Sequence, residues 1–142
     1  MKSFYVGVKG IILNDDKVLL LQRSKSERQD RFWDAPGGRM QDTESFEEAL
    51  TRELAEEIGN IKGITVTDLL HVYRLPKDVE HEHGLILVFF RVHATISDVI
   101  LSEEHDAYRW VSRDELASFF DTEALYINDG VKQAVQLALN QI

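Results

Sequence analysis

The sequence predicts a mixed fold of the α/β (α+β) class. Segments rich in β-branched and aromatic residues dominate the first hundred positions. Residues 43–58 and 129–140 have the apolar spacing of amphipathic helices. The chain has 142 residues, of which 44% are hydrophobic and 29% are charged, as in an ordinary globular protein. We therefore expect a single domain over residues 1–142, large enough to bury a core.

The N-terminal third is expected to be mostly strand. Phe4–Leu13 and Lys17–Arg23 are separated by the turn-forming residues at 14–16, which predicts a β-hairpin. Residues 24–31 are polar and predict a loop. Residues 32–38, Phe-Trp-Asp-Ala-Pro-Gly-Gly, predict a short strand that breaks into a tight turn, with Phe32 and Trp33 either filling the core or stacking on a planar ligand.

The remaining elements follow from caps and periodicity. A helix is predicted from Thr43 to Ile58, with Asp42 or Thr43 as its N-cap and Gly59 as its stop. Strands are expected at 64–75, 84–96 and 108–111, the first two joined by the charged loop KDVEHEH. The stretch Ser-Arg-Asp-Glu at 112–115 fits a capping box that begins a short helix, and a final amphipathic helix is expected at 129–140.

Composition excludes several classes of function. The sequence has no cysteine, which rules out disulfides, thiolate metal sites and a cysteine nucleophile. It has neither a signal-peptide pattern nor an apolar run long enough to span a membrane, so we expect a cytoplasmic protein that does not associate with membranes. The net charge of −9 opposes binding to nucleic acid. A small polyphosphate remains a suitable ligand if a divalent cation bridges the two anions.

The predicted central helix carries three carboxylates in an unfavourable place. Glu53, Glu56 and Glu57, in RELAEEIG, are neighbours at its C-terminal end, where like-charge repulsion and the helix dipole both disfavour them. Phe46, Leu50, Leu54 and Ile58 form the apolar arc of this helix. Glu53 and Glu57 lie about 20° to either side of Phe46, with Glu56 at the edge of the arc.

A bound cation explains this placement. Mg²⁺ prefers carboxylate oxygens and usually retains waters while it contacts a substrate phosphate. The alternative is that all three glutamates are solvated on an acidic helix face and the protein is an interaction module.

The spacing of residues 38–60 resembles the Nudix box of the Nudix hydrolase superfamily, of the MutT-like kind. Seven residues match at fixed spacing: Gly38, Glu44, Arg52, Glu53, Glu56, Glu57 and Gly59, with Leu54 in the aliphatic position. The chain departs from the pattern at Asn60, where an aliphatic residue is usual. The resemblance implies an α/β/α sandwich with a mixed central sheet.

The resemblance also implies chemistry. Members of this family use Mg²⁺ or Mn²⁺ to activate water against a nucleoside diphosphate linked to a group X, which is a small-molecule nucleotide. By similarity, the metal ligands are Glu53, Glu56, Glu57 and the carbonyl of Gly38. Arg52 orients the carboxylates and Glu44 supports the geometry of the loop and helix. Homodimers are common in the family. A catalytically inactive nucleotide-binding or sensor domain that keeps the box is the alternative.

Residues outside the box leave several assignments open. In LSEEHDAYRWV, Glu104 is the favoured general base, with Glu103 and Glu57 as alternatives. Arg23 ends a strand, where it either contacts a substrate phosphate or is an ordinary surface arginine. Gly37 and Gly38 allow the backbone to approach the substrate closely.

The substrate is also open. The LSEEHDAYRWV stretch is similar to one in hydrolases of nucleoside triphosphates and dinucleoside polyphosphates, whereas Pro76 stands where ADP-ribose hydrolases of the family carry a proline.

Overall fold

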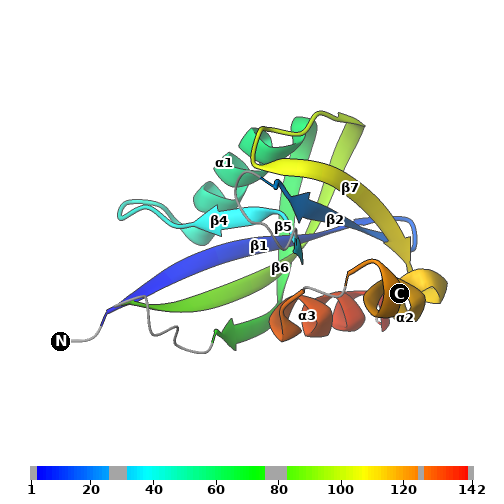
Figure 1. The fold of residues 1–142 in the computed structure, drawn as a ribbon. Helices are drawn as coiled ribbons and strands as arrows, with labels where there is room; N and C mark the ends of the chain where they lie inside the picture. The colour runs from blue at the N-terminus through cyan, green and yellow to red at the C-terminus, as the bar shows by residue number, and fades with distance from the viewer. Residues whose placement is uncertain (1–2, 26–31, 76–82, 125–126, 141–142) are drawn as a thin grey trace.

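The computed structural model describes residues 3–25, 32–75, 83–124 and 127–140, and a seven-stranded sheet forms its centre (Figure 1). In chain order the elements are β1 (Phe4–Asn14), β2 (Lys17–Arg23), β3 (Trp33–Asp34), β4 (Gly37–Arg39), α1 (Phe46–Ile58), β5 (Gly59–Arg74), β6 (Gly84–Val99), β7 (His105–Ser112), α2 (Arg113–Thr122) and α3 (Asp129–Asn140). None of the helices in this part of the chain is long and apolar enough to span a membrane.

The sheet is mixed, as predicted. The strands follow the order β3-β2-β1-β6-β5, with β4 also paired to β1 and β7 to β2. β1 runs parallel to β6, and the other pairs are antiparallel. The predicted hairpin of β1 and β2 is present, and Asp15 takes a φ of 55° in its turn. The described pairing between β1 and β2 covers only the residues beside that turn, so the strands diverge toward their other ends.

Helices cover both faces of the sheet, which confirms the α/β/α sandwich (Figure 1). Alternation along β1 directs Val8 and Ile12 to the face that packs on α1, where Leu50 and Leu54 are fully buried. Ile11 faces the other side and packs with residues of α2 and α3. Trp33 belongs to this second core, with its ring edge-on to Phe119 at 5.1 Å between centroids.

The start of α1 differs from the prediction. Its N-cap is Ser45, so the expected cap at Asp42 or Thr43 is wrong. The Ser45 hydroxyl accepts a hydrogen bond from the Glu48 amide at 3.1 Å, and the Glu48 carboxylate accepts one from the Ser45 amide at 3.1 Å. This reciprocal pair satisfies two backbone donors at once, which the alternative caps do not offer. Gly59 ends the helix as predicted, with φ at 82°.

The strand boundaries and one core residue also differ from the prediction. β5 begins directly at Gly59 and not at Ile64, because it pairs with the far end of β6. β7 begins at His105, three residues before the predicted Tyr108, since His105 pairs with Arg23. Phe46 is 45% exposed, because it stands in the first helical turn and its ring contacts Phe90 at the margin of the core. The capping box that begins α2 at Ser112 is present as predicted.

Candidate active site

A pocket of about 920 Å³ lies where the diverging strands, β4 and the last turns of α1 meet. Its charged lining residues are Lys9, Arg23, Asp34, Arg39, Glu53, Glu57 and Glu104. Its apolar lining residues are Phe32, Leu75, Leu85, Leu87 and Ile127. The pocket therefore offers both cations and anions beside an apolar wall.

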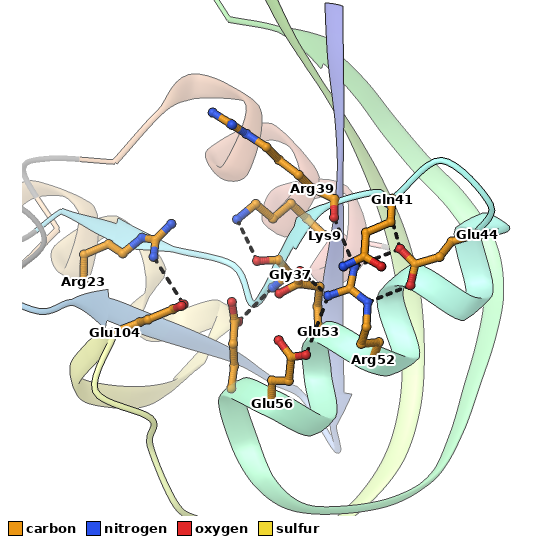
Figure 2. Close-up of polar contacts among 11 residues, drawn as sticks. Lys9, Arg23, Gly37, Arg39, Gln41, Glu44, Arg52, Glu53, Glu56 and Glu104 are labelled. Carbon is orange, nitrogen blue, oxygen red and sulfur yellow. Dashed lines mark hydrogen bonds and ion pairs between the residues drawn. The ribbon is translucent and has the colours of Figure 1, made fainter.

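Arg52 fastens the loop before α1 to the helix (Figure 2). Its Nε and Nη2 donate to the two carboxylate oxygens of Glu44 at 2.6 and 2.8 Å, a bidentate arrangement. Nη1 donates to Glu53 Oε1 at 2.9 Å, and Nη2 donates to the Arg39 carbonyl at 3.2 Å. The hydrogen bond from Arg52 lowers the pKa of Glu44 to about 2. Arg52 thus contacts both Glu44 and Glu53, and the orienting role of Arg52 and the supporting role of Glu44 stay predictions.

Glu53 lies against the backbone of Gly38. A Cβ atom on Gly38 would lie 2.5 Å from Glu53 Cδ and 2.6 Å from each of its carboxylate oxygens. A side chain on residue 38 would occupy the space of that carboxylate and displace it, and glycine leaves this space free. The resemblance to the Nudix box implied that Gly38 and Glu53 belong to one site, and in the structure both line the pocket.

Glu57 is buried, with 3% of its surface exposed. Its Oε2 accepts a hydrogen bond from the Gly37 amide at 2.9 Å. Burial raises the pKa of Glu57 to about 7, although the nearby Lys9 ammonium and the Gly37 hydrogen bond act in the opposite direction. A metal-free Glu57 is thus an anion that the protein solvates poorly.

Glu56 is separated from its two neighbours. Its side chain is 61% exposed and lies 3.7 Å from Arg52 Nη1, and it does not line the pocket, whereas Glu53 and Glu57 do. Its position at the edge of the apolar arc accounts for this exposure. Its role as a metal ligand stays a prediction.

The segment before β7 brings Glu104 to the pocket. Glu104 Oε2 lies 3.7 Å from Arg23 Nη1, and the Glu104 side chain is 53% exposed (Figure 2). Glu103 is exposed and does not line the pocket. Of these two adjacent glutamates, Glu104 is the one that lines the pocket.

Four further residues at the site were missed by reasoning from the sequence, and one of them is Arg39 in the pocket lining. Lys9 Nζ and Asp34 Oδ2 form a buried ion pair at 2.9 Å in the pocket wall. His105 is 6% exposed, and burial lowers its pKa to about 4, with the positive charge of Arg23 acting in the same direction. A lysine inside the apolar run VGVKGII was the available signal for Lys9. Asp34 and His105 carried no comparable signal, because only the strand pairing brings them to the site.

Replacement of Gly38 by alanine and replacement of Gly37 by alanine should have different consequences. We expect Gly38→Ala to move the flexible Glu53 carboxylate and to lower divalent-cation affinity by about 10- to 100-fold, with little change in folding. We expect Gly37→Ala to destabilise the fold by at least about 2 kcal/mol, because Gly37 has φ at 141° and the new Cβ would lie 2.0 Å from the Val8 carbonyl.

Calorimetric titration with Mn²⁺ and urea unfolding measure these two effects. Gly63→Ala is a control for the strain of a positive φ, since Gly63 has φ at 61° and no atom lies within 4 Å of its added Cβ. A Gly38→Ala variant with normal metal affinity would contradict the assignment of Glu53 to the metal site.

Comparison with known proteins identifies the family. A NUDIX domain family model matches residues 4–129. The CTP pyrophosphohydrolase of Escherichia coli (strain K12) is 31% identical over 112 residues, which cover 79% of this chain and 78% of that protein. The chain therefore belongs to the NUDIX family of hydrolases.

Two further relatives extend the comparison. The ADP-ribose pyrophosphatase of Methanocaldococcus jannaschii is 39% identical over 84 residues, which cover 59% of this chain and 48% of that protein. The crystal structure of the MutT protein from Methanosarcina mazei Go1 superimposes with a TM-score of 0.76 at 27% identity, and covers 99% of this chain and 95% of that one. These likenesses agree with the family identified from residues 38–60.

Proposed function

We propose that this chain hydrolyses a pyrophosphate bond in a nucleoside diphosphate linked to X, with Mg²⁺ or Mn²⁺ as cofactor, and that its substrates are (deoxy)nucleoside triphosphates. The observation that carries the proposal is the pairing of Glu53 and Glu57 on one wall of a pocket that also presents Arg23 and Arg39. The two carboxylates suit a divalent cation, and the two guanidiniums suit phosphate oxygens. The apolar wall suits a nucleobase.

The residues of the site fit a divalent cation. A buried Glu57 whose pKa is raised by burial regains a favourable environment when a cation is beside it. Glu53, Glu56, Glu57 and the Gly38 carbonyl would hold the cation, and oxygen donors of this kind are those that Mg²⁺ and Mn²⁺ prefer. When bound, the cation lowers the pKa of a coordinated water and neutralises charge on the phosphate oxygens.

In this proposal the side chains of the pocket bind the substrate and accept the proton. Arg23 and Arg39 bind the phosphates, and Phe32 with its apolar neighbours holds the base. Glu104 would accept a proton from water in this proposal, with Glu57 and Glu103 as the alternatives. Arg52 keeps Glu53 in orientation through the 2.9 Å hydrogen bond.

ADP-ribose is the second candidate substrate. The Methanocaldococcus jannaschii relative is an ADP-ribose pyrophosphatase by name, but it shares less of its length with this chain than the Escherichia coli CTP pyrophosphohydrolase does. The Pro76 hint toward ADP-ribose lies outside the described residues. We favour triphosphates because LSEEHDAYRWV is similar to a stretch in hydrolases of nucleoside triphosphates and dinucleoside polyphosphates, and we place dinucleoside polyphosphates next.

A substrate panel tests the proposal. CTP, the dNTPs, oxidised dGTP, diadenosine tetraphosphate, ADP-ribose and nucleotide sugars are each incubated with the protein and Mg²⁺, and with a chelator as control. We expect nucleoside monophosphate and pyrophosphate from at least one triphosphate, only with the cation. Calorimetric binding of a nucleotide without turnover of any compound would favour the inactive sensor domain instead. No saturable metal site would favour the acidic interaction module.

Three further proposals accompany this function. A single domain over residues 1–142, a cytoplasmic location and a homodimer are all typical of such an enzyme. Limited proteolysis tests the single domain, cell fractionation tests the location, and sedimentation velocity tests the homodimer.

A further inference from the structure

Two residues that line the pocket, Glu57 and Glu104, form a cluster with a buried histidine. Glu57, Glu104 and His105 each place one oxygen or nitrogen atom so that the three atoms lie within 4.8 Å of one another. Glu57 comes from the last turn of α1, whereas His105 is the first residue of β7 and Glu104 directly precedes it. We propose that His105 supplies an imidazole nitrogen to a divalent-cation site completed by Glu57 and Glu104, an inference that rests on the proposed metal-dependent function.

The fold fixes this cluster through backbone contacts. His105 pairs with Arg23 at the end of β2, next to a register shift in that strand. The Ser24 amide donates to the Glu104 carbonyl at 2.8 Å, and the His105 amide donates to the Ser102 carbonyl at 3.3 Å. On the other side, the 2.9 Å hydrogen bond from the Gly37 amide holds Glu57. Both halves of the cluster are therefore held by the sheet, and they meet without any loop having to close.

The burial of His105 points independently to a ligand. The residue is 6% exposed, and within the described part of the chain its Nδ1 is buried and has no hydrogen-bond partner. A buried polar atom without a partner costs on the order of 1–3 kcal/mol, so native structures rarely retain one without a reason. A cation held by Nδ1 would give this atom a partner and would place the proton of the imidazole on Nε2.

The distances suit a cation after a small adjustment. Metal–ligand bonds of about 2.1 Å place two ligand atoms at most about 4.2 Å apart. Atoms within 4.8 Å of one another thus need to approach by roughly half an ångström. Glu104 can make this movement because its side chain is 53% exposed and its ion pair with Arg23 is long, at 3.7 Å.

An imidazole ligand changes which metal the site prefers. Carboxylates alone favour Mg²⁺ and Mn²⁺, whereas imidazole raises the affinity for Co²⁺, Ni²⁺ and Zn²⁺ relative to Mg²⁺. The inference thus predicts a site that accepts Mn²⁺ or Co²⁺ more tightly than a set of carboxylates would. It also makes Glu104 a metal ligand when this site is filled, which would leave another group as the base.

Electron spin echo spectroscopy of Mn²⁺ bound to the full chain without nucleotide tests the inference. A directly coordinated imidazole couples its nitrogen to the Mn²⁺ electron spin. We expect this nitrogen modulation in the wild-type protein, and we expect His105→Gln to abolish it and to lower Co²⁺ affinity by about 10- to 100-fold. His93→Gln, at an exposed position of β6, is the matched control and should retain both.

The outcomes separate this inference from the proposed function. Tight Mn²⁺ binding by the wild type without nitrogen modulation would overturn the inference, even if nucleotides are hydrolysed normally. Nitrogen modulation that His105→Gln removes would support it, even if no nucleotide in the panel is cleaved. If His105→Gln fails to fold, selective ¹⁵N-histidine labelling of the wild type decides the question, because the modulation must then change to that of ¹⁵N.

Discussion

Glu57→Gln is expected to reduce nucleotide hydrolysis by at least about 100-fold, because groups that merely support a metal ligand already contribute up to about that factor. Glutamine retains the shape of the side chain and can still accept the hydrogen bond from the Gly37 amide. It removes the negative charge that a cation requires. Steady-state kinetics on the best substrate of the panel, at saturating Mg²⁺, measure the loss.

The same replacement should not weaken the metal-free fold. The pKa of Glu57 rises from 4.5 to about 7 on folding, so the folded protein binds a proton more tightly than the unfolded chain does. This preference is fully expressed below pH 4.5 and is lost as the pH rises through about 7. In chelator, wild-type stability should therefore fall across this window, by on the order of 3 kcal/mol. Glu57→Gln should lack this fall and be at least as stable as wild type at pH 8.

Urea unfolding at pH 5 and pH 8, each with chelator and with Mg²⁺, measures the stability effect. Mg²⁺ should restore the wild type at pH 8 and have little influence on the variant. Glu56→Gln is the matched control, because it removes the same charge from a side chain that is 61% exposed. This replacement should leave the free energy of unfolding of the metal-free protein unchanged. Normal hydrolysis together with marked destabilisation of Glu57→Gln would show that this carboxylate serves the fold and not the cation.

Local sequence patterns predicted which residues of α1 belong to the site better than they predicted which distant segments meet there. Helical periodicity placed Glu53 and Glu57 beside the apolar arc of α1, and both line the pocket. The same periodicity put Glu56 at the edge of the arc, and its side chain is exposed. A helical wheel gives direction around the axis but not depth below the surface. It therefore could not tell that Glu57 is buried whereas Phe46, on the same arc, is 45% exposed.

The rest of the site depends on pairing between distant segments. His105 reaches Glu57 because β7 pairs with β2, and Asp34 reaches Lys9 because the short strand β3 also pairs with β2. Neither pairing has a signature in the local sequence. The N-cap of α1 was predicted wrongly for a different reason. Several residues before α1 are able to cap the helix, and the reciprocal hydrogen bonds between Ser45 and Glu48 select Ser45 among them.

Lys9→Met is expected to destabilise the fold by about 3–5 kcal/mol, the usual cost of removing one partner from a buried ion pair. Lys9 and Asp34 are 6% and 5% exposed, and the Lys9 Nζ atom lies 2.9 Å from Asp34 Oδ2. Within the described residues, Asp34 Oδ1 is buried and has no hydrogen-bond partner, so Lys9 compensates most of the aspartate's charge. The replacement would also remove the positive charge that lowers the pKa of Glu57, and so adds to the excess of buried negative charge.

A double variant separates this electrostatic cost from lost packing. Lys9→Met combined with Asp34→Leu removes both charges, and we expect it to regain most of the lost stability because no unpaired ion remains. Arg109→Met is the control for solvated ion pairs, since the Arg109 side chain is 35% exposed and pairs with Glu115 and Glu123, and it should cost much less than Lys9→Met. Urea unfolding of the wild type, Lys9→Met, Asp34→Leu and the double variant at pH 7 gives the coupling free energy. A double variant as unstable as Lys9→Met would mean that the lysine stabilises the pocket wall through its packing, and that the buried charge of Asp34 is compensated by the rest of the site.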